Sequence, residues 1–292
     1  MKRMLIGLIG KNIQKSLSPA LQEDACAAAG MHALYHLMDL QALPGRSLES
    51  VLDAVRTVGF AGVNITYPCK EAVLPLLDEV SAEARQVGAV NTVTISRDGR
   101  TKGYNTDRIG FRRAFEEVLG RDAAAGKSVV LVGAGGAGRA VAYALFDLGV
   151  ESLLISDKER AQSTRLAAAL TGEFGPGRAR VATDPETELS KAAGVVNATP
   201  VGMLGIPGNP IRISAIAARH WVADVIYTPL ETELIKAARE KGSKVMGGAG
   251  MCVHQAAETF KLFTGLSADL TRMQRTFAAA AAEREKSLAD VN

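Results

Sequence analysis

The chain has 292 residues, of which 47% are hydrophobic and 22% are charged, and its formal net charge is +3. Such a composition is typical of a globular protein of one or two domains, and no apolar run reaches transmembrane length. Lysine and arginine are scattered rather than clustered, which argues against a nucleic-acid-binding surface. We therefore expect neither a nucleic-acid nor a membrane partner, and the sequence is compatible with a homodimer.

The three cysteines, Cys26, Cys69 and Cys252, are odd in number and widely spaced. This spacing indicates a reducing, cytoplasmic setting rather than a disulfide framework, and it forms no zinc motif with the four histidines. We expect no metal. The apolar run Met4–Gly10 resembles part of a signal peptide, but it is short and Lys11 interrupts it. A first β-strand is the better interpretation.

Apolar patterning before Leu119 predicts alternating strands and helices. The expected strands are Leu5–Ile9, Tyr35–Leu40, Gly62–Thr66, Ala89–Ser96 and Arg100–Tyr104. The expected helices are Pro19–Ala29, Ser47–Val58, Glu71–Leu77 and Ile109–Leu119, with a hairpin turn at Asp98-Gly99.

The strongest local signal follows the apolar strand Val129–Val132. The next six residues, Gly133 to Gly138, read G-x-G-x-x-G, and a helix at Arg139–Leu148 and a strand at Leu153–Ile155 come next. This is the dinucleotide-binding arrangement, in which the glycines allow a tight turn, an approach to pyrophosphate and close helix packing. The sequence therefore predicts a nucleotide site at this turn.

Asp157 lies just after the second strand of that unit, 19 residues beyond Gly138. A carboxylate there can accept hydrogen bonds from both ribose hydroxyls of NAD, and it repels the 2′-phosphate of NADP. Lys158 and Arg160 follow closely, but no arginine stands at the tip itself. We expect NAD as the cofactor, with NADP less favoured.

The pattern after Asp157 continues with strands at Val195–Asn197 and Val222–Ile226 and with two helices at the end of the chain. The expected loops are Gly172–Gly177 and Gly205–Pro210, and the final helices are Met251–Phe263 and Ala268–Glu285. The predicted fold class is α/β. An N-terminal α/β substrate domain, 1–108, is completed by returning C-terminal helices, 251–292, and 109–250 forms a doubly wound Rossmann-type domain.

Three polar segments interrupt the first part of the chain: Ser16–Pro19, Asn64–Lys70, and Asn91-Thr92 with Asn105–Asp107. Helix capping by Ser18 ahead of Pro19 accounts for part of the first segment, but it does not require Ser16. These segments are candidates for a substrate site.

Taken together, these motifs resemble the shikimate/quinate dehydrogenase family over essentially the full length. The resemblance rests on the three polar segments and on these further stretches: Gly7–Gly10, Gly88–Thr92, Gly133–Gly138, Asn197–Pro200 and Gly250-Met251. Ala72–Asp78 and Leu262–Leu266 are most similar to the NAD-linked quinate/shikimate branch.

The resemblance implies an oxidoreductase that interconverts shikimate and 3-dehydroshikimate, or quinate and 3-dehydroquinate, by hydride transfer. Lys70 and Asp107 would be the catalytic pair, with lysine accepting the hydroxyl proton and aspartate orienting it. The residues implied to hold the hydroxylated cyclohexene or cyclohexane carboxylate are Ser16, Ser18, Thr66, Asn91, Tyr227 and Gln255. His254 beside Gln255 is interpreted as a partly exposed helix residue without a catalytic role.

On the cofactor side, the resemblance assigns residues to each half of the dinucleotide. The glycine loop would hold the pyrophosphate, and Asp157 would hold the adenosine ribose. The implied cofactor residues are Gly133, Gly135, Gly136, Ala137, Asp157, Thr199, Val225 and Gly248.

The first loop departs from the family pattern. The family usually reads Gly-x-Pro-Ile-x-His-Ser where this chain has Gly10-Lys11-Asn12-Ile13-Gln14-Lys15-Ser16. This departure leaves substrate preference open, with an aminoshikimate dehydrogenase as the enzyme alternative. A ligand sensor without turnover is the alternative from another class, although such a protein would be expected to lose Lys70 or Asp107.

Overall fold

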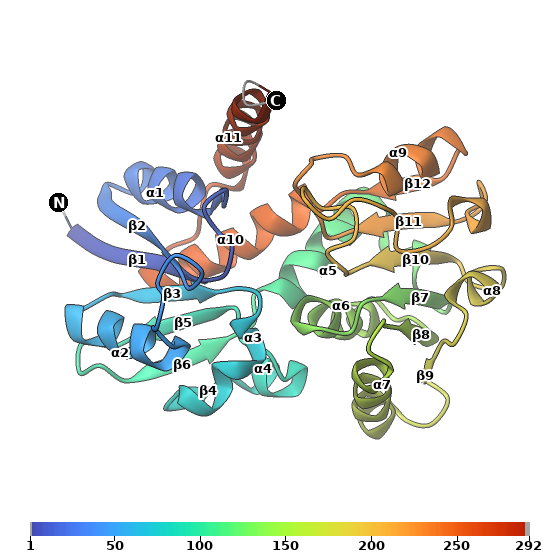
Figure 1. The fold of residues 1–292 in the computed structure, drawn as a ribbon, viewed down its shortest axis with the longest axis horizontal. Helices are drawn as coiled ribbons and strands as arrows, with labels where there is room; N and C mark the ends of the chain where they lie inside the picture. The colour runs from blue at the N-terminus through green and yellow to red at the C-terminus, as the bar shows by residue number, and fades with distance from the viewer. Residues whose placement is uncertain (1, 290–292) are drawn as a thin grey trace. The chain divides into compact units, whose positions relative to one another are not determined.

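The computed structural model describes residues 2–289, which form two compact units (Figure 1). The first unit holds the residues up to Thr106 together with those from Val253 onward, and the second is Asp107–Cys252. Each unit contains one six-stranded sheet. No helix within residues 2–289 is both long enough and apolar enough to cross a membrane.

The sheet of the first unit is mixed. Its strands, in spatial order, are β2 (Met31–Asp39), β1 (Lys2–Gly10), β3 (Gly62–Ile65), β5 (Thr92–Ile95), β6 (Thr101–Tyr104) and β4 (Glu79–Val80). β1 pairs in parallel with both β2 and β3, whereas β5 is antiparallel to β3 and β6. Consequently the carboxyl ends of β1, β3 and β6 share one edge with the amino end of β5.

Helices pack against this sheet and bury its apolar side chains. They are α1 (Ser18–Ala28), α2 (Leu48–Val58), α3 (Cys69–Ala72), α4 (Ala82–Val87), α10 (Ala249–Thr264), which begins in the second unit, and α11 (Leu270–Ala289), with a 3-10 turn η1 (Leu74–Leu76). The expected return of the C-terminal helices is confirmed, because α11 packs on α1. There the Arg272 guanidinium donates two hydrogen bonds to the Asp24 carboxylate, at 2.8 and 2.7 Å.

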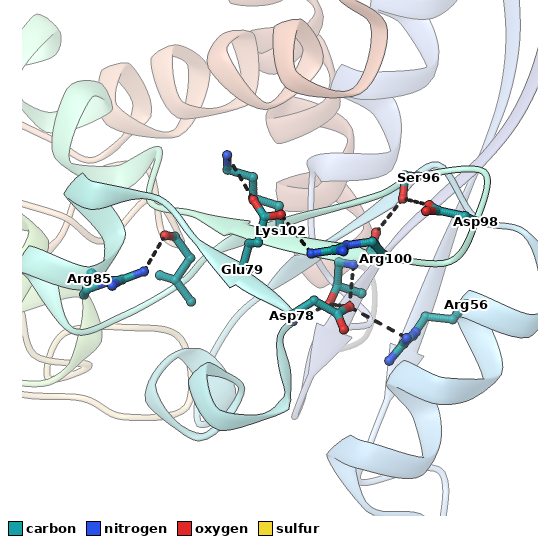
Figure 2. Close-up of polar contacts among 10 residues, drawn as sticks. Arg56, Asp78, Glu79, Arg85, Ser96, Asp98, Arg100 and Lys102 are labelled. Carbon is teal, nitrogen blue, oxygen red and sulfur yellow. Dashed lines mark hydrogen bonds and ion pairs between the residues drawn. The ribbon is translucent and has the colours of Figure 1, made fainter.

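Charged side chains protect the β4 edge of this sheet (Figure 2). The Asp78 Oδ2 atom accepts hydrogen bonds from the backbone N–H and the hydroxyl of Thr101, both at 2.8 Å. Glu79 forms ion pairs with Arg100 at 3.1 Å and with Lys102 at 3.4 Å. Charges on a short edge strand discourage pairing with another chain.

The sheet of the second unit is entirely parallel. Its spatial order is β12 (Lys244–Met246), β11 (Trp221–Asp224), β10 (Gly194–Asn197), β7 (Ser128–Val132), β8 (Ser152–Ser156) and β9 (Ala179–Val181) (Figure 1). In order of appearance this is 6-5-4-1-2-3, the doubly wound dinucleotide-binding order. Successive strands are added on one side of β7 up to β9 and on its other side from β10 onward, so the carboxyl ends of β7 and β10 flank the switch point where such folds bind ligands.

The helices of the second unit are α5 (Asp107–Val118), α6 (Gly136–Asp147), α7 (Arg160–Phe174), α8 (Pro185–Leu189) and α9 (Glu233–Glu240), with 3-10 turns η2 (Arg121–Ala123) and η3 (Ile213–Ala215). Fully buried valine and leucine residues of β7, β8 and β11 form the core. Such continuous apolar strands are typical of a parallel sheet covered on both faces. The expected α/β fold class is confirmed.

Several local predictions need correction. The predicted loop Gly172–Gly177 is helical as far as Phe174, because the Phe174 ring stacks on Phe146 with centroids 4.2 Å apart, and this packing extends α7. The predicted helix Glu71–Leu77 ends at Ala72, and Pro75 lies in the following 3-10 turn. Proline interrupts helical hydrogen bonding, so a shorter helix is the physical outcome.

Two further predictions concern boundaries. The predicted strand Ala89–Ser96 pairs only over Thr92–Ile95. Ser18 is not the cap of α1, since the helix already begins at Ser18 and Leu17 occupies the capping position. The Ser16 hydroxyl instead accepts a hydrogen bond from the Ser18 N–H at 3.2 Å.

Candidate functional site

The glycine loop joins β7 to α6 at the switch point of the second sheet. Gly133 has φ +105°, and a Cβ there would lie 2.7 Å from the Ala198 carbonyl, so this position requires glycine. A Cβ at Gly138 would collide with the Gly133 carbonyl. Gly135 is different, because the space beside its Cα is open. The first and third glycines are therefore fixed by packing, and the middle one leaves room for a ligand.

The backbone of this loop exposes the start of α6, a helix of 12 residues. No side chain caps the helix at Gly135. The unpaired N–H groups of a first helical turn and the positive end of its dipole bind phosphate groups. Gly136 and Ala137 are the first residues of α6, so their backbone N–H groups belong to this first turn.

Asp157 directly follows β8, the neighbour of β7. Its Oδ2 atom accepts a hydrogen bond from the Ala134 N–H at 2.7 Å, and its Oδ1 atom accepts one from the Glu159 N–H at 2.9 Å. The side chain is only half-buried, and each carboxylate oxygen has two lone pairs. Asp157 therefore holds the glycine loop and still has acceptor capacity for a pair of hydroxyl groups.

A buried polar cluster lies on the other side of the switch point, at the ends of β10 and β11. The Asn197 amide donates to the Asp224 Oδ1 atom at 3.1 Å and to the Val201 carbonyl at 3.1 Å. Its Oδ1 atom accepts from the Thr199 N–H at 2.9 Å and from the Thr199 hydroxyl at 2.7 Å. Asn197 thus fixes the loop that carries Thr199.

Asp224 is fully buried in this cluster, and no cation among the described residues pairs with it. Its carboxylate accepts hydrogen bonds from the Ile226 N–H at 3.0 Å and from the Thr232 hydroxyl at 2.8 Å. Burial raises the pKa of the Asp224 carboxyl to about 6, although hydrogen bonds from Ile226, Thr232 and Asn197 limit the rise.

Val225 and Gly248 lie beside this cluster. A Cβ at Gly248 would collide with the carbonyl oxygens of Val225 and Ile226, and the Gly248 N–H donates to Ile226 O at 3.1 Å. The structure thus brings Val225 and Gly248 together. Tyr227 follows in the same segment and is half-buried.

In the first unit, the sheet topology brings the predicted residues to one edge. Lys70 and Thr66 follow β3, Asn91 precedes β5, and Ser16 lies in the loop after β1. The Lys70 carbonyl accepts a hydrogen bond from the Val90 N–H at 2.8 Å, which fixes α3 against the start of β5. The Thr66 methyl group packs over Gly10, where no Cβ would fit.

A network of buried amides and hydroxyls supports this edge. Thr106 donates its N–H to the Asn91 Oδ1 atom at 2.8 Å, and the Asn91 amide donates to the Thr106 hydroxyl at 2.9 Å. The Thr106 hydroxyl also donates to the Gln255 Oε1 atom at 3.4 Å. Asn91 and Gln255, which are far apart in sequence, are thereby connected through one hydroxyl.

Four deeper residues of this network, Asn64, Thr92, Thr259 and Tyr35, were given no individual role by the sequence analysis. The Asn64 amide donates to the hydroxyls of Thr92 at 3.0 Å and Thr259 at 3.3 Å, and the Tyr35 hydroxyl donates to Asn64 Oδ1 at 2.8 Å. Asn64 belongs to a recognised motif, but nothing local to Thr259 in α10 could have indicated this contact. Full satisfaction of such buried groups fixes their positions.

Asp107, the first residue of α5, is buried, and Lys70 is half-buried. The sequence predicted a partly exposed His254, and this prediction is wrong, since His254 is only 5% exposed in α10. The described residues contain no group of three histidine, cysteine, aspartate or glutamate side chains that could hold a metal ion.

The chain is similar in sequence and in fold to proteins of known function. Residues 8–93 match the family model described as the shikimate dehydrogenase substrate binding domain. The chain is 48% identical over 278 residues to the quinate/shikimate dehydrogenase (NAD(+)) of Corynebacterium efficiens, covering 94% of this chain and 97% of that relative. The chain belongs to the shikimate/quinate dehydrogenase family.

Other members of the shikimate/quinate dehydrogenase family differ in their named cofactor. The shikimate dehydrogenase (NADP(+)) of an Arthrobacter species is 45% identical, with 94% of each chain covered. The solved quinate dehydrogenase from Corynebacterium glutamicum in complex with NAD is 44% identical, with 96% of this chain and 100% of that chain covered and a TM-score of 0.88. The resemblance inferred from the motifs is confirmed.

The raised pKa of Asp224 predicts a specific pH dependence of stability. The folded protein binds this proton more tightly than the unfolded chain does, so the stabilisation is present below about pH 4 and lost as the pH rises through about 6. A shift from 3.8 to about 6 corresponds to about 3 kcal/mol. Asp224→Asn keeps the shape of the side chain and cannot ionise.

Denaturant unfolding of the wild type and Asp224→Asn between pH 4 and 7.5 measures this effect. We expect the wild type to lose about 2–3 kcal/mol relative to the variant as the pH rises to about 7. A stability difference that does not change with pH would contradict the burial of an ionisable group at this point.

Proposed function

We propose that this protein is an NAD-dependent oxidoreductase that interconverts shikimate and 3-dehydroshikimate and also acts on quinate. Membership of the family supports the reaction class, and similarity to NAD-linked relatives supports the cofactor. The proposal depends most on the position of Asp157, which directly follows β8 and accepts a hydrogen bond from the glycine loop. The substrate is a small hydroxylated ring carboxylate, as the named substrates of the relatives suggest.

The choice of NAD rests on charge. Relatives of nearly equal identity are named for NAD and for NADP, so identity alone does not decide the cofactor. The Asp157 carboxylate accepts hydrogen bonds from ribose hydroxyls and repels a 2′-phosphate. In this proposal the pyrophosphate binds Gly133, Gly135, Gly136 and Ala137, and Thr199, Val225 and Gly248 contact the nicotinamide half.

The proposed catalytic pair is Lys70 and Asp107. NAD, when bound, supplies the hydride acceptor for the hydrogen on the carbinol carbon. The Lys70 amine accepts the proton of the reacting hydroxyl, so the carbonyl forms as the C–H and O–H bonds break. In this proposal the Asp107 carboxylate orients the lysine. Both side chains are the right chemical types, and the buried position of Asp107 suits an orienting role.

The proposed substrate-binding residues are Ser16, Ser18, Thr66, Asn91, Tyr227 and Gln255. Ser18 is the first residue of α1 and Ser16 lies two residues before it, where hydroxyl donors and backbone N–H groups suit a carboxylate. Asn91 and Gln255 meet at the Thr106 hydroxyl and are thus held in fixed positions for the ring hydroxyls. The widely spaced cysteines support a cytoplasmic location for this activity.

Initial rates with shikimate and quinate, each with NAD and NADP, test the proposal directly. We expect turnover of shikimate with NAD at a higher kcat/KM than with NADP, and turnover of quinate as a second substrate. No activity with either acid and either cofactor would contradict the proposed function.

Replacing the proposed base tests the mechanism. Lys70→Ala should lower kcat by about 10²–10⁴-fold, the usual contribution of a general base, with a much smaller change in substrate KM. Lys102→Ala is a matched control, since Lys102 is paired with Glu79 at the β4 edge. Near-normal turnover by Lys70→Ala would show that another group moves the proton.

Replacing the ribose carboxylate tests cofactor choice. Asp157→Ser should lower kcat/KM for NAD by about tenfold, as expected for loss of a charged hydrogen bond, and should raise the relative rate with NADP. The double variant with Asp157→Ser and Lys158→Arg should have a still smaller ratio of kcat/KM for NAD to kcat/KM for NADP. Asp184→Ser serves as control, because Asp184 accepts backbone N–H bonds at the start of α8 in the same unit. Equal kcat/KM values for NAD and NADP in the wild type would overturn the assignment.

A further inference from the structure

Asp39 ends β2 directly beside Gly10, the last residue of β1. Its Oδ1 atom accepts hydrogen bonds from the N–H groups of Asn12 and Gln41, both at 3.0 Å. Its Oδ2 atom accepts from the Ile13 N–H at 3.1 Å and from the Gln14 side chain at 3.3 Å. One carboxylate therefore binds three consecutive residues of the loop that follows β1.

Asp39 is only 5% exposed, so these bonds form away from bulk water. Burial alone would raise the pKa of the Asp39 carboxyl, but hydrogen bonds from Gln41, Ile13, Asn12 and Gln14 lower it below its ordinary value. The carboxylate is thus ionised at neutral pH. Hydrogen bonds to an ionised acceptor are stronger than neutral ones.

The bonds from Asp39 reach the substrate residues through the backbone of the same loop. The Ser16 N–H donates to the Ile13 carbonyl at 2.9 Å, and the Ser18 N–H donates to the Ser16 hydroxyl at 3.2 Å. Ile13 is buried, and its position therefore sets the position of Ser16. At the start of the loop, the Lys11 N–H donates to the Tyr67 carbonyl at 2.9 Å.

Asn12 takes an uncommon backbone conformation, with φ +57°. Among residues 2–289 it is the one non-glycine residue with positive φ. Asparagine tolerates this region better than most residues, but the conformation still needs support from its surroundings. The Asn12 N–H bond to Asp39 supplies that support. A proline at this position could adopt neither this φ nor this bond.

We propose that Asp39 is a positioning residue for substrate, which holds the loop Lys11–Leu17 so that Ser16 and Ser18 meet the ring carboxylate. This inference rests on the proposed function, because it assigns a purpose to the two serines. Asp39 itself touches no substrate. It acts by fixing the backbone of Asn12 and Ile13, and through them the serine hydroxyls.

Asp39→Asn is the direct test. The amide has nearly the same shape, but one of the two oxygens becomes an NH₂ group that faces a backbone N–H. We expect the KM for shikimate to rise by about tenfold, as for one lost charged hydrogen bond, while kcat and the KM for NAD stay within about twofold.

Asp78→Asn is the matched control. Asp78 also accepts a backbone N–H, from Thr101 at 2.8 Å, but it lies at the β4 edge and has no bond to the Lys11–Leu17 loop (Figure 2). This variant should leave the KM for shikimate unchanged. If Asp39→Asn and Asp78→Asn have the same KM for shikimate, or if Asp39→Asn raises the KM for NAD equally, the inference is overturned.

Substitutions at Asn12 provide a second test that leaves Asp39 in place. Asn12→Gly keeps the N–H and accepts positive φ, so its KM for shikimate should match the wild type. Asn12→Pro removes the N–H and forces negative φ, so its KM for shikimate should rise as in Asp39→Asn. Equal KM values in these two variants would contradict the inference. A wild type that turns over neither shikimate nor quinate would overturn the proposed function instead.

Discussion

Backbone N–H groups that follow a parallel strand have no partner in the ladder, and the loops of this protein depend on carboxylates to supply one. In two places an aspartate at the end of the neighbouring strand does so directly, and in a third place an aspartate acts through a side-chain amide. Asp39 holds the loop after β1, Asp157 holds the loop after β7, and Asp224 holds the Asn197 side chain that orders the loop after β10. Unpaired polar groups in such positions are costly, so these bonds restrict the loops to one path.

The strand register explains why an aspartate at a strand end recurs beside the loop of the neighbouring strand. Gly10 pairs with Asp39 in the first sheet, and Asn197 pairs with Asp224 in the second. Val132 pairs with Ser156, which places Asp157 one residue beyond the ladder. In each case the carboxylate projects from the end of one strand toward the loop of the next. Each unit therefore presents its candidate ligand-binding residues on loops fixed by its own sheet.

The sequence predicted the parts of the site that local pattern determines. The glycine loop and Asp157 were identified because a strand, a turn, a helix and an acid follow one another within one short segment. The residues Ser16, Thr66, Lys70 and Asn91 came from resemblance, and their gathering at one sheet edge follows from the strand order. Their roles stay proposals until the substitutions are made.

The remaining features depend on contacts between residues distant in sequence. Asn64 meets Thr259 across 195 positions, and Asp39 meets Asn12 across 27, so neither bond leaves a local signal. The burial of His254 could not be predicted for the same reason, since it depends on what packs against α10. The extension of α7 to Phe174 likewise required knowledge of the stacking partner, Phe146.

Amide hydrogen exchange in the ligand-free protein tests the central claim most directly, because it measures the loops themselves and not catalysis. The account predicts slow exchange at Ile13 and Ala134 in the wild type. Asp39→Asn should accelerate exchange at Ile13 and leave Ala134 unchanged, and Asp157→Ser should accelerate exchange at Ala134 and leave Ile13 unchanged, each acceleration being about tenfold. Exchange at both amides that is unaffected by either substitution would show that the carboxylates do not hold these loops.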